Sequence, residues 1–194
     1  MEIKTDRQKE IMVAALELIA GKGIQNFTMK NLSKKIGITE PAIYRHFENK
    51  IEILISILDN MVRNSGSIIE QELNFEGEAI VKLEHIFSKH FETFSNTPAL
   101  VSVIFSEEIF RNEPTLIQKV MEVMDKNDVV ITSIVQSGQK NDEIRTDTDA
   151  KHLSIMVMGI LRLFVKKWQF SSYSFSLQEE GNKLFESIKL LIAA

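Results

Sequence analysis

The chain has 194 residues, of which 44% are hydrophobic and 26% charged, and its formal net charge is -4. This is the composition of a globular protein of one or two domains, and a chain of this length can fold without disulfides or a structural metal. It contains no cysteine, which excludes disulfide frameworks, iron–sulfur clusters, cysteine-ligated zinc and thiol catalysis.

The amino-terminal residues and the apolar stretches predict a cytoplasmic protein with no membrane partner. Charged side chains are scattered through residues 1–10, and Glu17 interrupts the apolar run that follows, which argues against a secretory signal. The most apolar stretch, residues 155–161, ends at Arg162 and is far shorter than the roughly 20 residues that cross a bilayer.

Charge is unevenly distributed along the chain. Residues 1–50 carry nine Lys or Arg and six Asp or Glu, a net charge of +3, which leaves -7 for residues 51–194. A small basic region before an acidic body is typical of a polyanion-binding module attached to a domain with another task. The excess of positive charge is modest, and chance variation over fifty residues is the alternative explanation for it.

Apolar residues recur at three- and four-residue spacing almost throughout, which predicts an all-α fold. The first helix is expected over about residues 6–21. A short helix capped by Thr28 is then expected to end near Ile36, and a second one capped by Thr39 to end near Phe47. Gly37 is expected in the turn between them, and Pro41 lies in the first turn of the second short helix.

The helical pattern continues to the end of the chain. Asn49 and Glu52 have the spacing of a capping box and begin a long helix, and Ser176 and Glu179 have the same spacing before the last helix. The expected ranges are about 49–73, 78–95, 98–111, 114–139, 149–170 and 176–192. No linker or repeat interrupts them, so we expect an N-terminal domain, residues 1–50, continuous through a helix with a C-terminal domain, residues 51–194.

Residues 27–47 have the pattern helix, tight turn, helix, which is the geometry of a helix-turn-helix. Five apolar residues are spaced to pack the two short helices on each other and on the first helix: Leu32, Ile36, Ile38, Ile43 and Phe47. The opposite face of the second short helix carries Glu40, Ala42, Tyr44, Arg45 and His46. A major groove of about 12 Å admits one helix, so these side chains could reach phosphates and base edges.

This segment resembles the TetR family of bacterial transcriptional regulators. The matching string around the second short helix is Thr39, Ala42, Ile43, Tyr44, Arg45, His46, Phe47, Asn49 and Lys50. Over about residues 6–60 the resemblance rests on the sequence motif, and beyond residue 60 it rests on the number and length of the expected helices. It implies a DNA-binding regulator with no enzymatic activity and no cofactor, built from an N-terminal three-helix domain and a C-terminal helical bundle.

The resemblance also implies roles for individual residues. Thr28 and Thr39 would cap helices whose N-termini face phosphates, and Tyr44, His46 and Lys50 would clamp the DNA backbone. The candidates for reading base edges are Lys30, Glu40, Pro41, Ala42 and Arg45. Glu40 has a second reading, as an acid in the first helical turn that favours the helix dipole.

The C-terminal region is rich in Phe and Met, and the resemblance implies a pocket there for a bulky, apolar effector. The candidate lining residues are Phe87, Phe91, Phe105, Met121, Met124, Met158, Phe164 and Trp168. Helical spacing also explains these residues as ordinary core.

The last two helices are expected to form a two-fold, four-helix dimer interface. Its candidate residues are Leu153, Gly159, Ile160, Leu161, Leu184, Ile188 and Leu191. Gly159 would let two helices approach closely. The alternative is that these helices pack only within one chain.

Together these features predict a ligand-responsive repressor that binds a pseudo-palindromic DNA operator as a homodimer and is released by an apolar small molecule. The alternative is a helical protein-interaction adaptor without sequence-specific DNA binding. An enzyme is disfavoured, because helical di-metal sites use Glu-x-x-His pairs and only His152, with Asp149, has an acid three residues before it. The sequence also lacks Gly-x-Ser-x-Gly and a Gly-rich phosphate loop.

Overall fold

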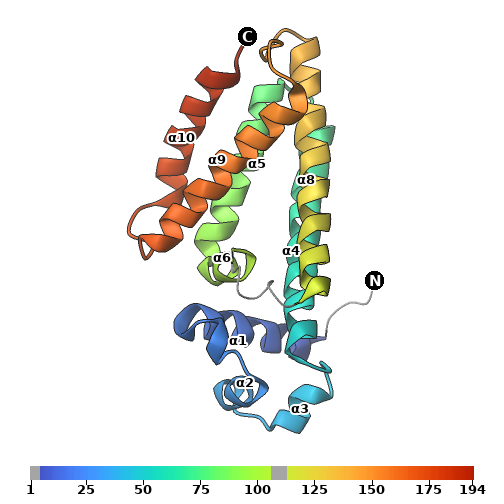
Figure 1. The fold of residues 1–194 in the computed structure, drawn as a ribbon, viewed down its shortest axis with the longest axis vertical. Coiled ribbons are helices and arrows are strands. Elements are labelled where there is room, and N and C mark those ends of the chain that lie inside the picture. The colour runs from blue at the N-terminus through green and yellow to red at the C-terminus, as the bar shows by residue number, and fades with distance from the viewer. Residues whose placement is uncertain (1–4, 106–112) are drawn as a thin grey trace. The chain divides into compact units, whose positions relative to one another are not determined.

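The computed structural model describes residues 5–105 and 113–194, and for residues 64–74 it describes the backbone (Figure 1). It confirms the all-α class, because the described residues form helices and turns and contain one isolated bridge, between Ile144 and Ala193, in place of any β-strand. Two compact units divide the chain. The N-terminal unit contains Met1–Val62 and Pro98–Met121, and the C-terminal unit contains Arg63–Thr97 and Glu122–Ala194.

The N-terminal unit is built on the first helix. Its elements are α1 (Asp6–Lys22), η1 (Ile24–Asn26), α2 (Met29–Ile36), α3 (Glu40–Tyr44), the start of α4 (Lys50–Asn74), α6 (Pro98–Ile104) and the start of α8 (Pro114–Lys140). Helix α1 packs against α2 and α6. The helix expected over residues 98–111 is described as far as Ile104, and residues 106–112 lie outside the described residues.

The core of the N-terminal unit follows the helical periodicity. The expected apolar face of α1 is buried, at Ile11, Ala14, Ala15, Leu18 and Ile19. Leu32, Ile43 and Phe47 are buried between the short helices and α1, with at most 1% exposed. Ile36 and Ile38, which flank the turn at Gly37, are half-buried, so they cover the edge of this core.

The C-terminal unit contains α5 (Ala79–Asn96), α9 (Ala150–Phe170) and α10 (Leu177–Ile192), with the later parts of α4 and α8. Helix α10 lies along α5 and also packs on α9 (Figure 1). The expected cap of α10 is confirmed, since the Ser176 hydroxyl accepts a hydrogen bond from the N–H of Glu179. Helix α9 is capped by the Asp149 carboxylate, which accepts hydrogen bonds from two of its backbone N–H groups. Helix α5 differs, because the carboxylate of Glu143, from the loop before α9, caps its first N–H at Ala79.

No helix in the described ranges is both long enough and apolar enough to cross a bilayer.

The close approach of α10 to α5 depends on Gly181. A Cβ at this position would be closer to the Phe91 ring than van der Waals contact allows, and this ring is fully buried. We expect Gly181→Ala to lower the free energy of unfolding by about 1–3 kcal/mol, because the buried Phe91 ring or the backbone of α10 must shift to admit the methyl group. Urea unfolding followed by helical circular dichroism measures this change. The control is Gly21→Ala, which meets no atom within 4 Å and should be neutral or slightly stabilising; equal effects of both variants would contradict the prediction.

Candidate nucleic-acid interface

Helix α2 begins and ends at the residues that the sequence indicates. The Thr28 hydroxyl accepts a hydrogen bond from the Asn31 N–H at 3.1 Å, which confirms the expected N-cap. Gly37 has the left-handed backbone conformation, φ 78° and ψ 29°, and the N–H groups of Gly37 and Ile38 both donate to the Ser33 carbonyl. This cap ends α2 and directs the chain into α3.

Helix α3 is shorter than expected. Thr39 occupies the N-cap position and Pro41 the first turn, but the Thr39 side chain makes no capping hydrogen bond. The helix ends at Tyr44 instead of near Phe47, because the Ile43 carbonyl accepts from the N–H of both His46, at 2.8 Å, and Phe47, at 3.1 Å. A hydrogen bond spanning three residues tightens the backbone and ends the α-helical register.

Helix α3 presents a polar face on the side opposite its buried residues. Ile43 is fully buried, whereas 49% of Tyr44 is exposed, so Tyr44 is not a core aromatic residue. Most of the predicted DNA-contacting residues are exposed: Thr28, Lys30, Thr39, Pro41, Tyr44, Arg45 and Lys50. The others are half-buried: Glu40, Ala42 and His46. Among the described residues no ion pair involves Lys30, Arg45 or Lys50, so their charges are available for an external anion.

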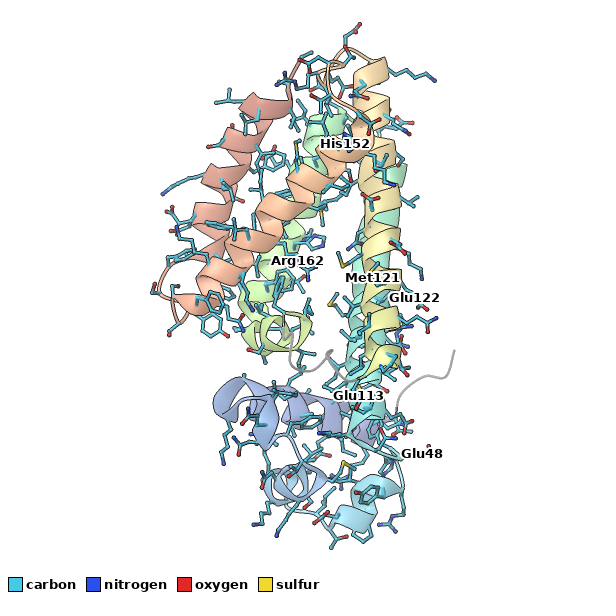
Figure 2. All side chains as sticks on the ribbon, viewed as in Figure 1. Glu48, Glu113, Met121, Glu122, His152 and Arg162 are labelled. Carbon is cyan, nitrogen blue, oxygen red and sulfur yellow. The ribbon has the colours of Figure 1, made fainter. Side chains whose placement is uncertain are left out.

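Side chains hold the α4 end of the connector between α3 and α4, which contains Glu48 (Figure 2). Asn49 caps α4 as expected, accepting from the N–H groups of Ile51 and Glu52 at 2.9 and 3.0 Å. The reciprocal half of the expected capping box is shifted by one residue, since the Glu52 carboxylate accepts from the N–H of Glu48. The connector is therefore fixed to the first turn of α4.

Sequence reasoning missed a contact from α1 to this connector. The Gln8 side chain donates from Nε2 to the carbonyl of His46 at 3.3 Å. Gln8, three residues after Thr5, is also the last residue of a Thr-x-x-Gln capping box, a pattern that is visible in the sequence. Nothing in the sequence indicates its partner 38 residues away.

Two ion pairs link helices of the N-terminal unit. Glu17 of α1 and Lys35 of α2 are 2.8 Å apart, so this lysine, unlike Lys30, is paired within the chain. Lys119 of α8 and Asp59 of α4 are 2.5 Å apart, with less than a quarter of each side chain exposed. These pairs join α1 to α2 and α4 to α8.

The predicted pocket residues are divided between the two units. Phe87, Phe91 and Phe164 form successive ring contacts in the C-terminal unit, with centroids 5.9 and 6.0 Å apart. Trp168 is buried in the same unit and Met158 is half-buried, whereas 43% of Met124 is exposed and its Sδ lies 3.5 Å from Arg162. Phe105 and Met121 belong to the N-terminal unit, where Phe105 is half-buried and 49% of Met121 is exposed.

The predicted interface residues also differ in exposure. Leu153, Leu161 and Ile188 are buried within the chain, and Ile160 and Leu184 are half-buried. Gly159 and Leu191 are exposed. Four further apolar residues of α9 have more than half of their surface exposed: Ile155, Met156, Leu163 and Phe170. We call these four residues the α9 stripe.

His90 is a titratable group of the C-terminal unit whose pKa is changed by burial. Burial lowers the pKa of its imidazole below the ordinary value, and the hydrogen bond from Nδ1 to the Ile86 carbonyl, at 2.7 Å, partly opposes this. Its ring also lies 6.3 Å from that of Phe94. Within the described ranges no three His, Asp or Glu side chains are placed to bind a metal ion.

The lowered pKa of His90 predicts a pH-dependent stability. The unfolded chain takes up the proton near pH 6.5, whereas the folded chain takes it up only at lower pH. The contribution of His90 to the free energy of unfolding is therefore complete above about pH 6.5. It decreases as the pH falls, by at most about 1.4 kcal/mol per pH unit. Urea unfolding at pH 7.5 and 5.5 should show a smaller loss for His90→Phe than for the wild type. The exposed control, His152→Gln, should lose as much stability as the wild type; an unchanged loss in His90→Phe would contradict the assignment.

Comparisons with known proteins agree with this geometry. Residues 11–57 match the model of bacterial regulatory proteins of the tetR family, and residues 54–194 match the model of the YsiA-like protein C-terminal region. The chain belongs to the TetR family. This confirms the resemblance seen in the sequence and makes the protein a TetR-family transcriptional regulator with a DNA-binding helix-turn-helix.

Relatives of known name match nearly the whole chain. The fatty acid metabolism regulator protein of Bacillus subtilis is 25% identical over 186 residues, which cover 96% of this chain and 95% of the relative. Among solved structures, the fatty acid degradation regulator FadR from Bacillus halodurans gives a TM-score of 0.86 at 20% identity, covering 97% of both chains. FadR from Bacillus subtilis in complex with stearoyl-CoA gives a TM-score of 0.80 at 24% identity, covering 93% of this chain and 96% of that chain.

Proposed function

We propose that this TetR-family regulator is a repressor that binds a pseudo-palindromic operator as a homodimer and releases it on binding a long-chain acyl-CoA. The proposal of DNA binding rests on the exposed polar face formed by α3 and the start of α4. Tyr44, Arg45 and Lys50 are exposed there, while Ile43 and Phe47 hold the helix-turn-helix together from the buried side.

The roles of the proposed DNA-contacting residues follow from their chemistry. Tyr44, His46 and Lys50 contact phosphates and set the register, together with the capped ends at Thr28 and Thr39. Base edges are read by Lys30, Glu40, Pro41, Ala42 and Arg45. In this assignment residues 1–50 bind DNA, and residues 51–194 bind the effector and form the dimer.

The identity of the effector is supported by the named relatives and by the composition of the C-terminal region. A regulator of the same fold is known with stearoyl-CoA bound, and a relative of nearly equal length regulates fatty acid metabolism. An acyl chain needs a long apolar lining, which adaptable Met and large aromatic side chains provide. The lining residues proposed from the sequence are Phe87, Phe91, Phe105, Met121, Met124, Met158, Phe164 and Trp168.

Release of DNA requires that the effector bind one conformation more tightly than the other. Helix α4 starts one residue after Asn49, beside the DNA-contacting connector, and continues to Asn74 without a break. In the proposed mechanism the acyl-CoA favours a tilt of α4 that alters the spacing of the two recognition helices. The change in operator affinity then equals the difference in effector affinity between the two conformations.

The first test is selection of binding sites from random duplex DNA by the purified protein, with its mass measured in solution. A dimer that enriches an inverted repeat is the expected result. A folded protein that enriches no sequence at low and at physiological salt would instead support the adaptor alternative, because phosphate contacts strengthen as salt falls.

The second test adds stearoyl-CoA to the protein bound to a fluorescent duplex carrying the selected site. Anisotropy should fall towards that of free DNA, whereas CoA alone and stearate alone should have little effect. If calorimetry shows that stearoyl-CoA binds but operator affinity stays unchanged at saturation, the proposed control by acyl-CoA is wrong.

A further inference from the structure

Gln8 connects the start of α1 to the end of the recognition helix. Its Nε2 donates to the His46 carbonyl at 3.3 Å, and this contact is partly buried. His46 lies beyond the end of α3 and its C-cap Arg45, so its carbonyl is outside the hydrogen-bond ladder of that helix. The two residues belong to the same compact unit although 38 positions separate them.

The Thr5–Gln8 capping box fixes the orientation of the Gln8 amide. Its Oε1 accepts from the Thr5 N–H at 2.9 Å, and the Thr5 hydroxyl accepts from the Gln8 N–H at 3.2 Å. Since the amide oxygen is used in the box, the NH₂ group is the part of the amide that remains to bond the His46 carbonyl. One side chain therefore both caps α1 and holds the connector.

Gln8 completes the anchoring of a connector whose other end is already held. At that end the Glu52 carboxylate accepts from the Glu48 N–H and Asn49 caps α4. The anchored segment includes His46 and lies between Tyr44 and Lys50, the proposed phosphate-binding residues. A displacement of its backbone would move all three side chains relative to the DNA.

From these contacts we infer that Gln8 is a positioning residue for DNA binding, acting through the His46 carbonyl on the connector that carries the phosphate contacts. This inference rests on the proposed function, because the connector is taken to face DNA. Gln8 itself need not touch the nucleic acid. Its contribution is to keep the connector in the geometry that binds phosphates, so that less ordering is needed when DNA binds.

The decisive variant is Gln8→Glu. Glu is favoured at the third position of a helix, where its carboxylate still accepts from the Thr5 N–H, so the capping box and the stability of α1 are retained. A carboxylate cannot donate to the His46 carbonyl and repels it. We expect affinity for a duplex carrying the selected site to fall about tenfold, the effect of losing one well-placed hydrogen bond per half-site.

The matched control is Thr5→Asp, since Gln8→Glu also adds a negative charge near DNA. Asp is as good an N-cap as Thr, and the substitution adds the same charge one turn away while the Gln8 amide keeps both bonds. We expect its affinity to fall less than that of Gln8→Glu. The loss due to charge should shrink at higher salt, whereas the loss due to the connector should persist.

A second measurement tests the order of the connector backbone in the absence of DNA. Hydrogen–deuterium exchange of the backbone amides of residues 45–49 should be faster in Gln8→Glu than in Thr5→Asp or the wild type, at unchanged unfolding midpoints. Equal exchange, or an affinity of Gln8→Glu within twofold of Thr5→Asp, would overturn the role of Gln8. If the wild type itself selects no DNA site, the proposed function fails, and the exchange measurement still decides whether Gln8 holds the connector.

Discussion

Replacing Leu163 with Glu is expected to convert the proposed homodimer into monomers. Leu163 lies on α9 with 71% of its surface exposed, in the α9 stripe with Ile155, Met156 and Phe170. In the proposed homodimer the two stripes cover each other, and each buried Leu contributes about 1.5–3 kcal/mol. A Glu there must be desolvated, and by symmetry it occurs twice in the interface. We therefore expect the dissociation constant to rise by at least about a hundredfold.

Analytical ultracentrifugation over a range of concentrations measures this change directly. Val129→Glu is a matched control, because Val129 is equally exposed, at 70%, but lies on α8 rather than on α9. It should remain dimeric. A dimer that persists in Leu163→Glu, or that dissociates equally in Val129→Glu, would contradict an interface on the α9 stripe.

The same substitution should weaken DNA binding although it lies far along the chain from α3. Two recognition helices on one dimer bind two half-sites together, and linking two binding events raises affinity by about 10²–10⁴ over one. Leu163→Glu should lose most of this gain in affinity for the inverted repeat. Its affinity for a duplex with a single half-site should change little. An equal loss on both duplexes would indicate damage to the DNA-binding unit itself.

The helices and most of their caps could be predicted from the sequence because they depend on neighbouring residues. Thr28, Asn49, Asp149 and Ser176 each accept a hydrogen bond from an N–H within the next three residues. The left-handed turn at Gly37 is local in the same sense. Helical periodicity also placed Ile43 in the core and left Tyr44 on the open face.

Contacts between distant segments could not be predicted in this way. Nothing near Gln8 indicates the His46 carbonyl, and nothing near Ala79 indicates that Glu143 caps its helix. The predicted dimer face shows the same limit. Periodicity indicates that α9 has apolar residues, but two of the residues chosen from it, Leu153 and Leu161, pack within the chain. Which apolar residues remain exposed depends on how the neighbouring helices pack.

Arg45→Ala is the substitution expected to separate base reading from phosphate binding. Arg45 is exposed, directly follows α3 and makes no ion pair among the described residues, so its guanidinium is available to a base edge. A bidentate contact to guanine contributes about 1–3 kcal/mol of discrimination, and the proposed homodimer would make it in each half-site. Affinity for the selected site should therefore fall at least about thirtyfold, whereas affinity for random duplex DNA should change much less.

Lys50→Gln is the matched comparison, because it removes one positive charge from the start of α4. Lys50 is proposed to contact phosphate only, so its loss should weaken selected and random duplexes by the same factor. Each lost phosphate contact should also reduce the dependence of log affinity on log salt by about 0.9, or about twice that for a dimer. If Arg45→Ala weakened both duplexes equally, Arg45 would be a phosphate contact, and base reading would rest on the residues of α2 and α3: Lys30, Glu40, Pro41 and Ala42.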